Sequence, residues 1–146
     1  MEIEKTISAE EVIGKFNPLA LENKSDPDAK PVIAICPDWR SNIDEATGVR
    51  LRFIRQVGFD LLMNMQQKAD FRAYVLRFED KIEDVLDFVD GLIIPGGRDI
   101  DPELYGEQNT FSVFDKVDSK LRWDHITNCL SNVPKKLPIM GICAGY

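Results

Sequence analysis

Residues that could build a disulfide framework or a metal site are scarce in this 146-residue sequence, which holds three cysteines and one histidine. An odd number of cysteines at irregular spacing does not form a set of disulfides. No pair of cysteines has the spacing of metal ligands, and His125 is expected in a helix, away from Cys143. We therefore expect no structural zinc site, no other metal and no cofactor.

The chain also lacks a basic surplus and a long hydrophobic run. Its formal net charge is −7, whereas phosphate binding needs a concentrated basic face. The apolar runs are only as long as a strand, and the acidic N-terminus has no basic start followed by an apolar stretch. We expect a cytoplasmic protein with neither a nucleic-acid nor a membrane partner.

The overall composition is that of an ordinary globular domain. Hydrophobic residues make up 44% and charged residues 29%, and 146 residues suffice for one compact domain. A short helix can begin after Ser8 and continue through Phe16, and the following residues are polar and rich in turn formers. We predict an acidic N-terminal extension over residues 1–29 and a domain over residues 30–146.

Short apolar strands alternate with helical patterns after residue 30. Strands are predicted at residues 31–36, 71–78, 91–95 and 137–143, and helices at residues 47–68, 81–89 and 117–132. Asp80 is expected to cap the second of these helices, and three arginines to lie on the solvated face of the first: Arg50, Arg52 and Arg55. Strands that are apolar throughout indicate a parallel sheet covered on both faces, an α/β three-layer sandwich. Such sheets bind ligands beyond the carboxyl ends of their strands.

One glycine-rich pattern surrounds a cysteine at the end of the last strand. The residues Gly141-Ile142-Cys143-Ala144-Gly145 resemble a sharp strand-to-helix turn that exposes a nucleophile, because small neighbours let the chain pack tightly there. A helix that begins at such a turn lowers the pKa of the thiol. Taken alone, the pattern also fits a small core residue, which is the commoner use of a cysteine in an apolar strand.

A second glycine cluster, Pro95-Gly96-Gly97, ends the preceding predicted strand. A double glycine allows the backbone to turn an N–H group into the crevice. Two such groups that converge on one oxygen form an oxyanion hole. A plain tight turn explains these three residues equally well when they are considered alone.

The two clusters together resemble a known family. The stretch DGLIIPGGRDIDPELYGE (residues 90–107), followed by LPIMGICAGY (residues 137–146), is similar to the class I glutamine amidotransferase superfamily. Within it, the likeness is to the branch of gamma-glutamyl-gamma-aminobutyrate hydrolases, and it covers Lys30 to Tyr146. The resemblance implies a flavodoxin-like fold and a Cys-His-Glu triad that cleaves small-molecule gamma-glutamyl amides through a thioester.

The resemblance also assigns site residues by position. Cys143 matches the nucleophile, and the backbone N–H groups of Gly97 and Ala144 match the oxyanion-hole donors, although many members of that branch have arginine where Ala144 stands. The loop of residues 98–107 matches the loop that flanks the substrate mouth. Asp99 and Asp101 either tie this loop to backbone amides or meet the substrate amine. Arg122 and Asp124 remain without a role.

The histidine and glutamate of that triad lie C-terminal to the nucleophile, whereas this sequence stops at Tyr146. His125 is expected at the surface or at a helix end rather than in catalysis. We therefore expect Cys143 to be positioned but not activated, and the chain to be either the N-terminal part of a longer protein or dependent on a partner or a homo-oligomer. Three alternatives stay open: a glutaminase subunit that delivers ammonia to a synthetase, a non-catalytic relic or interaction module, and the intracellular-protease branch.

Overall fold

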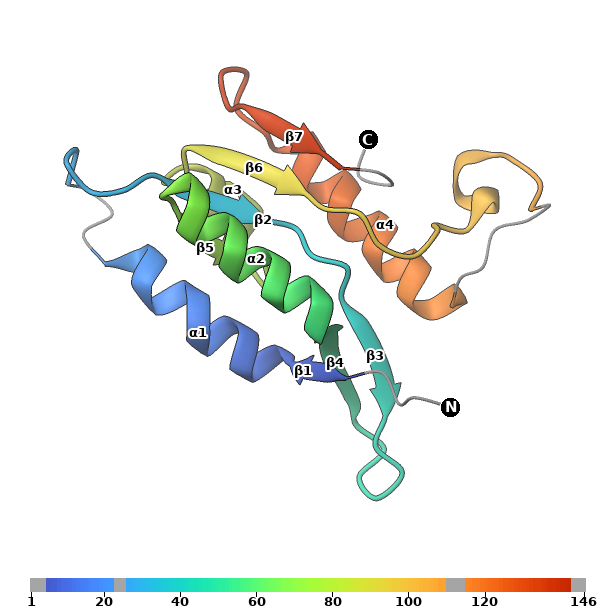
Figure 1. Ribbon diagram of the computed structural model, residues 1–146. Coiled ribbons are helices and arrows are strands. Elements are labelled where there is room, and N and C mark those ends of the chain that lie inside the picture. The colour runs from blue at the N-terminus through green and yellow to red at the C-terminus, as the bar shows by residue number, and fades with distance from the viewer. Residues whose placement is uncertain (1–4, 23–25, 110–114, 143–146) are drawn as a thin grey trace.

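The structure is a computed structural model that describes residues 5–22, 26–109 and 115–142 (Figure 1). Its helices are α1 (Ala9–Leu21), α2 (Gln56–Ala69), α3 (Ile82–Leu86) and α4 (Lys116–Ser131), with a 3₁₀ turn, η1 (Pro102–Tyr105). Its strands are β1 (Thr6–Ser8), β2 (Val32–Ile35), β3 (Arg40–Ile43), β4 (Arg50–Arg55), β5 (Arg72–Val75), β6 (Gly91–Ile94) and β7 (Ile139–Gly141). None of the helices in the described ranges is long and apolar enough to cross a bilayer.

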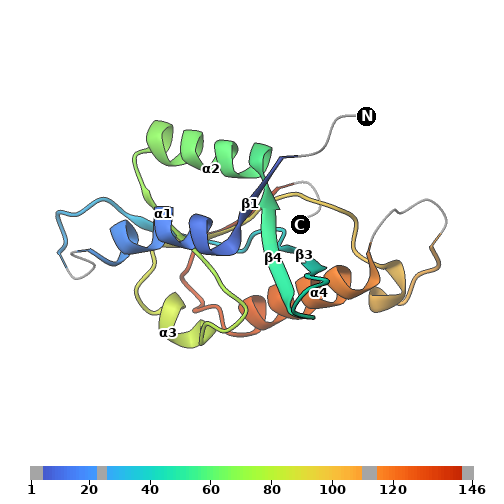
Figure 2. The same cartoon turned by 90° about the horizontal axis from the view of Figure 1, so that it is seen from below.

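Four of these strands form a parallel sheet in the order β5-β2-β6-β7. If these four strands are numbered 1 to 4 by their order along the chain, their arrangement across the sheet is 2-1-3-4. Flavodoxin-like sheets begin with the same arrangement. Helix α2 lies on one side of this sheet, and α3 and α4 lie on the other (Figure 2). The predicted α/β architecture with a parallel sheet is therefore confirmed.

The sheet separates two hydrophobic clusters, one on each face. The cluster under α1 and α2 is centred on Phe16, Ile35 and Val75, and the cluster under α3 and α4 is centred on Leu76, Leu92 and Ile94. Every residue of β5 and β6 is buried, so both strands are covered on both faces, as is usual in parallel sheets.

Helix α1 covers the open edge of β5. Ser8 caps the helix by accepting a hydrogen bond from the Glu11 amide at 3.2 Å, which agrees with the expected start. Further along, the Asn17 side chain donates to the Val75 carbonyl at 3.0 Å and accepts from the Val75 amide at 2.8 Å. One amide side chain thus pairs both backbone groups of an edge residue, as a neighbouring strand would. The helix lies within the expected extension of residues 1–29, whose boundary stays a prediction.

A second, antiparallel sheet has the strand order β1-β4-β3. The prediction of one helix over residues 47–68 is wrong before residue 56: Arg50–Arg55 is strand β4 and the helix begins at Gln56. The apolar spacing of four residues continued across two elements, and the alternation of arginines with apolar residues was the stronger signal. The three arginines therefore lie on a strand, where Arg52 stacks over the Phe78 ring at 4.4 Å.

Trp39 lies at the seam between the two sheets. It directly precedes β3, is only 3% exposed, and donates from Nε1 to the carbonyl oxygen of Leu76 at 2.9 Å, just after β5.

The expected cap of α3 is also wrong. Lys81 occupies the cap position, and the Asp80 carboxylate instead accepts hydrogen bonds from Tyr74 and Arg77.

Candidate functional site

Two neighbouring strand ends meet where the sequence predicted a site. Strands β6 and β7 pair in parallel, with Ile94 opposite Gly141, and the Ile142 amide extends the ladder by donating to the Ile94 carbonyl at 3.0 Å. Pro95, Gly96 and Gly97 follow Ile94 directly. Cys143 and Ala144 follow Ile142 and lie outside the described residues. The fold thus brings the strands that lead into both glycine clusters side by side.

Gly97 is packed tightly against Asp38, which follows the end of β2. A β-carbon at Gly97 would lie 2.5 Å from Oδ2 and 2.7 Å from Cβ of Asp38, closer than nonbonded atoms allow. The amide of the next residue, Arg98, donates to the same Oδ2 at 3.1 Å. The glycine is therefore needed because the Asp38 carboxylate holds the turn from the side on which a side chain would stand.

Arg122 of α4 hydrogen-bonds the backbone of this turn. Its guanidinium donates to the carbonyl of Pro95 at 2.8 Å and to the carbonyl of Arg98 at 3.0 Å. The side chain is 3% exposed and lies 3.7 Å from Oδ1 of Asp38. A charged group bonded at both ends of the glycine turn fixes the directions of its peptide groups, so Arg122 is a positioning residue for the turn.

A second buried carboxylate links the turn to the antiparallel sheet. Asp118 accepts hydrogen bonds from the amide and hydroxyl of Ser41 and from Arg98, whose guanidinium is 2.9 Å away. Burial by itself raises the pKa of Asp118, but the hydrogen bonds from Ser41 and Arg98 outweigh it and leave the pKa below its ordinary value. Asp118 is thus held as an anion beneath the loop.

The loop of residues 98–107 is tied down at Asp101. This side chain is 7% exposed and accepts from the Glu103 amide at 3.0 Å, which starts the turn η1. The Asp101 amide donates to the Ser119 hydroxyl of α4 at 2.6 Å. Of the two roles left open for this carboxylate, the geometry favours fastening the loop.

The sequence matches a family model described as peptidase C26 over residues 31–146. This chain belongs to the peptidase C26 family. It is also 30% identical over 122 residues to a putative glutamine amidotransferase-like protein of Rickettsia prowazekii (strain Madrid E). That match covers 80% of this chain and 41% of the relative, so the chain spans well under half the length of the relative it matches.

Membership of the C26 family agrees with the class I glutamine amidotransferase resemblance of the sequence. Among the residues that shape the turn of this C26 chain, sequence reasoning missed Asp38 and Asp118 and left Arg122 without a role. A signal for Asp38 was present, since it follows a buried strand by three residues, where ligand-facing groups of α/β sheets gather. Arg122 carried no such signal, because only the folded helix brings it under the turn.

A cavity of about 440 Å³ opens beside the same strand ends of the C26 domain. Its lining includes Gly96, Gly97 and Ile142 from the strand ends and Arg40 from β3. The opposite wall is the apolar face of α2, with Leu61 among its members. Arg40, Arg55 and Asp38 supply the charged groups of a hollow that is otherwise lined by apolar residues and glycines, a composition typical of small-molecule sites.

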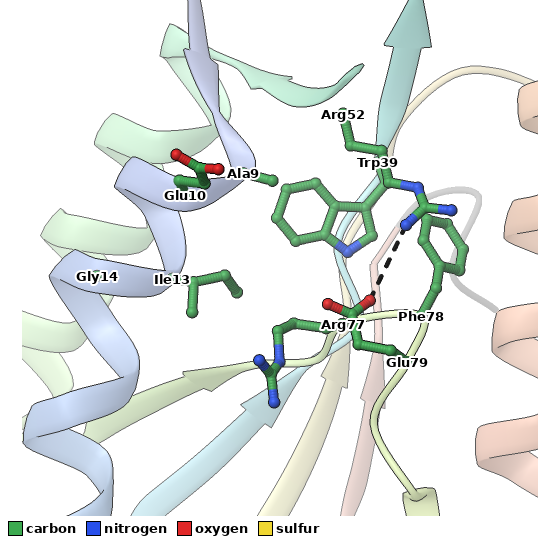
Figure 3. A pocket seen from close by; sticks show the side chains of 9 residues that line it. All are labelled: Ala9, Glu10, Ile13, Gly14, Trp39, Arg52, Arg77, Phe78 and Glu79. Atoms are coloured by element: carbon green, nitrogen blue, oxygen red, sulfur yellow. Dashed lines mark ion pairs between the residues drawn. The ribbon is translucent and has the colours of Figure 1, made fainter. Parts of the chain in front are cut away.

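A second cavity of about 360 Å³ lies elsewhere in the C26 chain, between α1 and the segment after β5. Figure 3 shows Ile13 and Trp39 among the side chains that line it, with Arg52 and Glu79 joined by an ion pair of 3.9 Å. Neither glycine of the strand-end turn lines it. This hollow is therefore separate from the candidate active site.

His125 does not lie at the surface, which corrects the expectation for this residue. It is 5% exposed, and its ring lies 4.8 Å from that of Phe78. Its Nδ1 faces the Cys36 sulfur at 3.5 Å. Burial lowers the pKa of His125 to about 4, so the ring is neutral at physiological pH.

Proposed function

We propose that this chain carries the acylation half of a cysteine hydrolase that acts on gamma-glutamyl amides, with Cys143 as the nucleophile. The observation that carries the proposal is the backbone pairing of Ile142 with Ile94. It supports a geometry in which the residue after Ile142 and the glycine turn after Ile94 share one crevice. Gly97, where a β-carbon would lie 2.5 Å from the Asp38 carboxylate, lets the chain pass close to Asp38 beside this crevice.

In the proposed reaction, the Cys143 thiolate attacks the gamma-carbonyl carbon of the substrate. A carbon–sulfur bond forms, the carbonyl oxygen becomes an oxyanion, and the N–H groups of Gly97 and Ala144 donate to it. Collapse of this intermediate expels the amine, which takes a proton, and leaves a thioester on Cys143. Water then attacks the thioester carbon, releases glutamate and restores the thiol.

The 146 residues offer no suitable general base for Cys143 in this proposal. Its single histidine, His125, is buried with Nδ1 at the Cys36 sulfur, an arrangement that does not suit a general base in the crevice. We propose that the base comes from outside these residues. Without a base, a thiol keeps a pKa of about 8.5 and reacts slowly at neutral pH.

An activated substrate with an added base tests the proposal on the chain as it is. A gamma-glutamyl p-nitrophenyl ester has a good leaving group, and imidazole in the buffer can replace the missing histidine. We expect a burst of one nitrophenolate per chain, a gamma-glutamyl adduct on Cys143 by mass spectrometry, and turnover that rises with imidazole concentration. Cys143→Ser should abolish the adduct, whereas Cys36→Ser, which removes a buried thiol, should retain it. An adduct that survives Cys143→Ser would falsify the proposal.

A second function from the same chemistry is a glutaminase that passes ammonia to a synthetase partner. The name of the Rickettsia relative, a glutamine amidotransferase-like protein, favours this candidate. Comparison of acylation by glutamine with acylation by gamma-glutamyl-gamma-aminobutyrate separates the two functions. A preference of about tenfold or more for glutamine would favour the amidotransferase role.

A further inference from the structure

Three potential metal ligands come together on the face of the sheet covered by α4, outside the glycine turn. The sulfur of Cys36, the sulfur of Cys129 and a ring nitrogen of His125 all lie within 4.8 Å of one another. Cys36 is the first residue after β2, and the other two residues lie on α4. The fold therefore assembles donors that are about ninety residues apart in sequence.

The spacing on α4 explains how two of the donors share one side. His125 and Cys129 are four residues apart, so their side chains leave the helix one turn apart on the same face. That face points at the sheet, where both residues are buried. In the sequence, no two cysteines have the spacing of metal ligands. In the fold, the end of β2 places Cys36 opposite His125 and Cys129 of α4.

The state of the ring suits metal binding. Nδ1 faces the Cys36 sulfur at 3.5 Å, and Nε2 is buried and has no hydrogen-bond partner among the described residues. A ring that carries its proton on Nε2 directs the Nδ1 lone pair at this sulfur, and a neutral imidazole is the form that binds a metal.

The charge and the burial of these three ligands limit which metal ions the cluster can bind. Cys36 and Cys129 are both 0% exposed, and a buried pair of thiolates without a counter-charge is costly. Two thiolates with a divalent cation are neutral together, whereas with a monovalent cation they leave one negative charge. Sulfur and imidazole ligands select Zn²⁺ and Cu⁺ over Mg²⁺ or Ca²⁺.

We propose that Cys36, His125 and Cys129 form a binding site for one thiophilic cation, Zn²⁺ or Cu⁺, that ties the end of β2 to α4. Three protein ligands leave one position of a tetrahedral zinc site for an outside ligand. Phe78 contacts the His125 ring and also lines the cavity of Figure 3, so a single side chain lies between that cavity and the cluster.

Metal titration of the purified, reduced chain tests the site directly. We expect one Zn²⁺ or one Cu⁺ per chain by elemental mass spectrometry after gel filtration, and a cobalt adduct with sulfur-to-metal charge-transfer absorption. Binding should strengthen as pH rises from about 6 to 8, because the ion must displace thiol protons. The Zn²⁺ and Cu⁺ arms, run under the same reducing conditions, decide which ion the site prefers.

Single substitutions assign the ligands. Cys36→Ser, Cys129→Ser and His125→Gln should each lower metal affinity by at least about tenfold, whereas Cys143→Ser should leave the stoichiometry at one. Circular dichroism confirms that each variant is folded, and the cobalt spectrum of the unaltered chain remains decisive if a variant is not. A folded chain that binds none of these ions, or that loses its metal through Cys143→Ser, would overturn the proposal and leave the cluster as a hydrogen-bonded thiol pair.

Discussion

Gly97 and Asp38 lie closer together than any other residue type at position 97 would permit, with the position of a β-carbon only 2.5 Å from the carboxylate. We expect Gly97→Ala to push the turn away from Asp38 and to lower the rate of Cys143 acylation by about a hundredfold, because one oxyanion donor is displaced. Overpacking should also lower the free energy of unfolding by about 1–3 kcal/mol. Stopped-flow measurement of nitrophenolate release and urea denaturation test these two effects.

Gly14 offers a matched control for this substitution. It lies inside α1, and nothing approaches within 4 Å of the position that its β-carbon would take. Gly14→Ala should therefore stabilise the chain by about 0.5–1 kcal/mol through helix propensity and leave acylation unchanged. Equal acylation rates for Gly97→Ala and Gly14→Ala would show that the turn does not shape the crevice.

Arg122 should contribute to both stability and acylation, because it bonds the carbonyls at both ends of the turn. Arg122→Met leaves these carbonyls and the Asp38 carboxylate without their buried cation, at a cost of about 3 kcal/mol. Arg122→Lys keeps the charge but loses the two-pronged geometry, so we expect it to restore stability more than acylation. Acylation that recovers fully in the lysine variant would argue against a positioning role.

Asp118 should make stability depend on pH in acid. Its folded pKa lies below the ordinary value, so its contribution is complete above the unfolded pKa of about 3.9 and is lost as pH falls through the folded pKa. The difference in unfolding free energy between the chain and Asp118→Asn should therefore shrink as pH is lowered from about 6 to 3. Asp124→Asn, whose exposed carboxylate pairs with Lys120, should differ by less than about 0.5 kcal/mol throughout.

Asn17 should protect the open edge of β5. Asn17→Ala leaves the buried Val75 amide and carbonyl unpaired, which costs about 1–3 kcal/mol for each group. Hydrogen exchange at the Val75 amide should accelerate well beyond the change at Leu92 on the interior strand β6. A control at the exposed end of α4, Asn132→Ala, should change stability by less than about 0.5 kcal/mol.

Strands β2 and β6 and helix α4 lie within one residue of their predicted bounds, the strands because a continuous apolar run between turn residues leaves few alternatives. Strands β5 and β7 are shorter than predicted, and β7 is largely exposed rather than covered on both faces. Strand β4 was missed because Phe53 and Val57 continue a helical spacing across a strand–helix junction, and only pairing with β1 and β3 decides the first half. The glycines after β6 were noticed in the sequence, and the turn at Cys143 stays a prediction because it lies outside the described residues. The contact of Arg122 with the Pro95–Arg98 segment depends on packing between distant segments, which no local pattern encodes.

The edge of the sheet at β7 bears on self-association. Within the described part of the chain β7 has a partner on one side only, and Ile139 and Met140 are 45% and 56% exposed. Unpaired apolar strands attract other chains, so we expect the sedimentation coefficient to rise with protein concentration. Met140→Lys should suppress this rise, whereas Leu21→Lys on α1, which is 44% exposed, should not. A concentration-independent monomer would contradict the expectation.

The fluorescence of Trp39, which is buried between the two sheets, reports on how these sheets pack together. Trp39 is bonded to Leu76 beside the parallel sheet and continues directly into the antiparallel one, so its emission wavelength responds when the sheets part and water reaches the ring. In a Trp123→Phe variant, Trp39 is the single tryptophan, and its emission would report whether the antiparallel sheet separates before the parallel sheet unfolds. Events that leave the helices intact, and so escape circular dichroism, become measurable on the unlabelled protein.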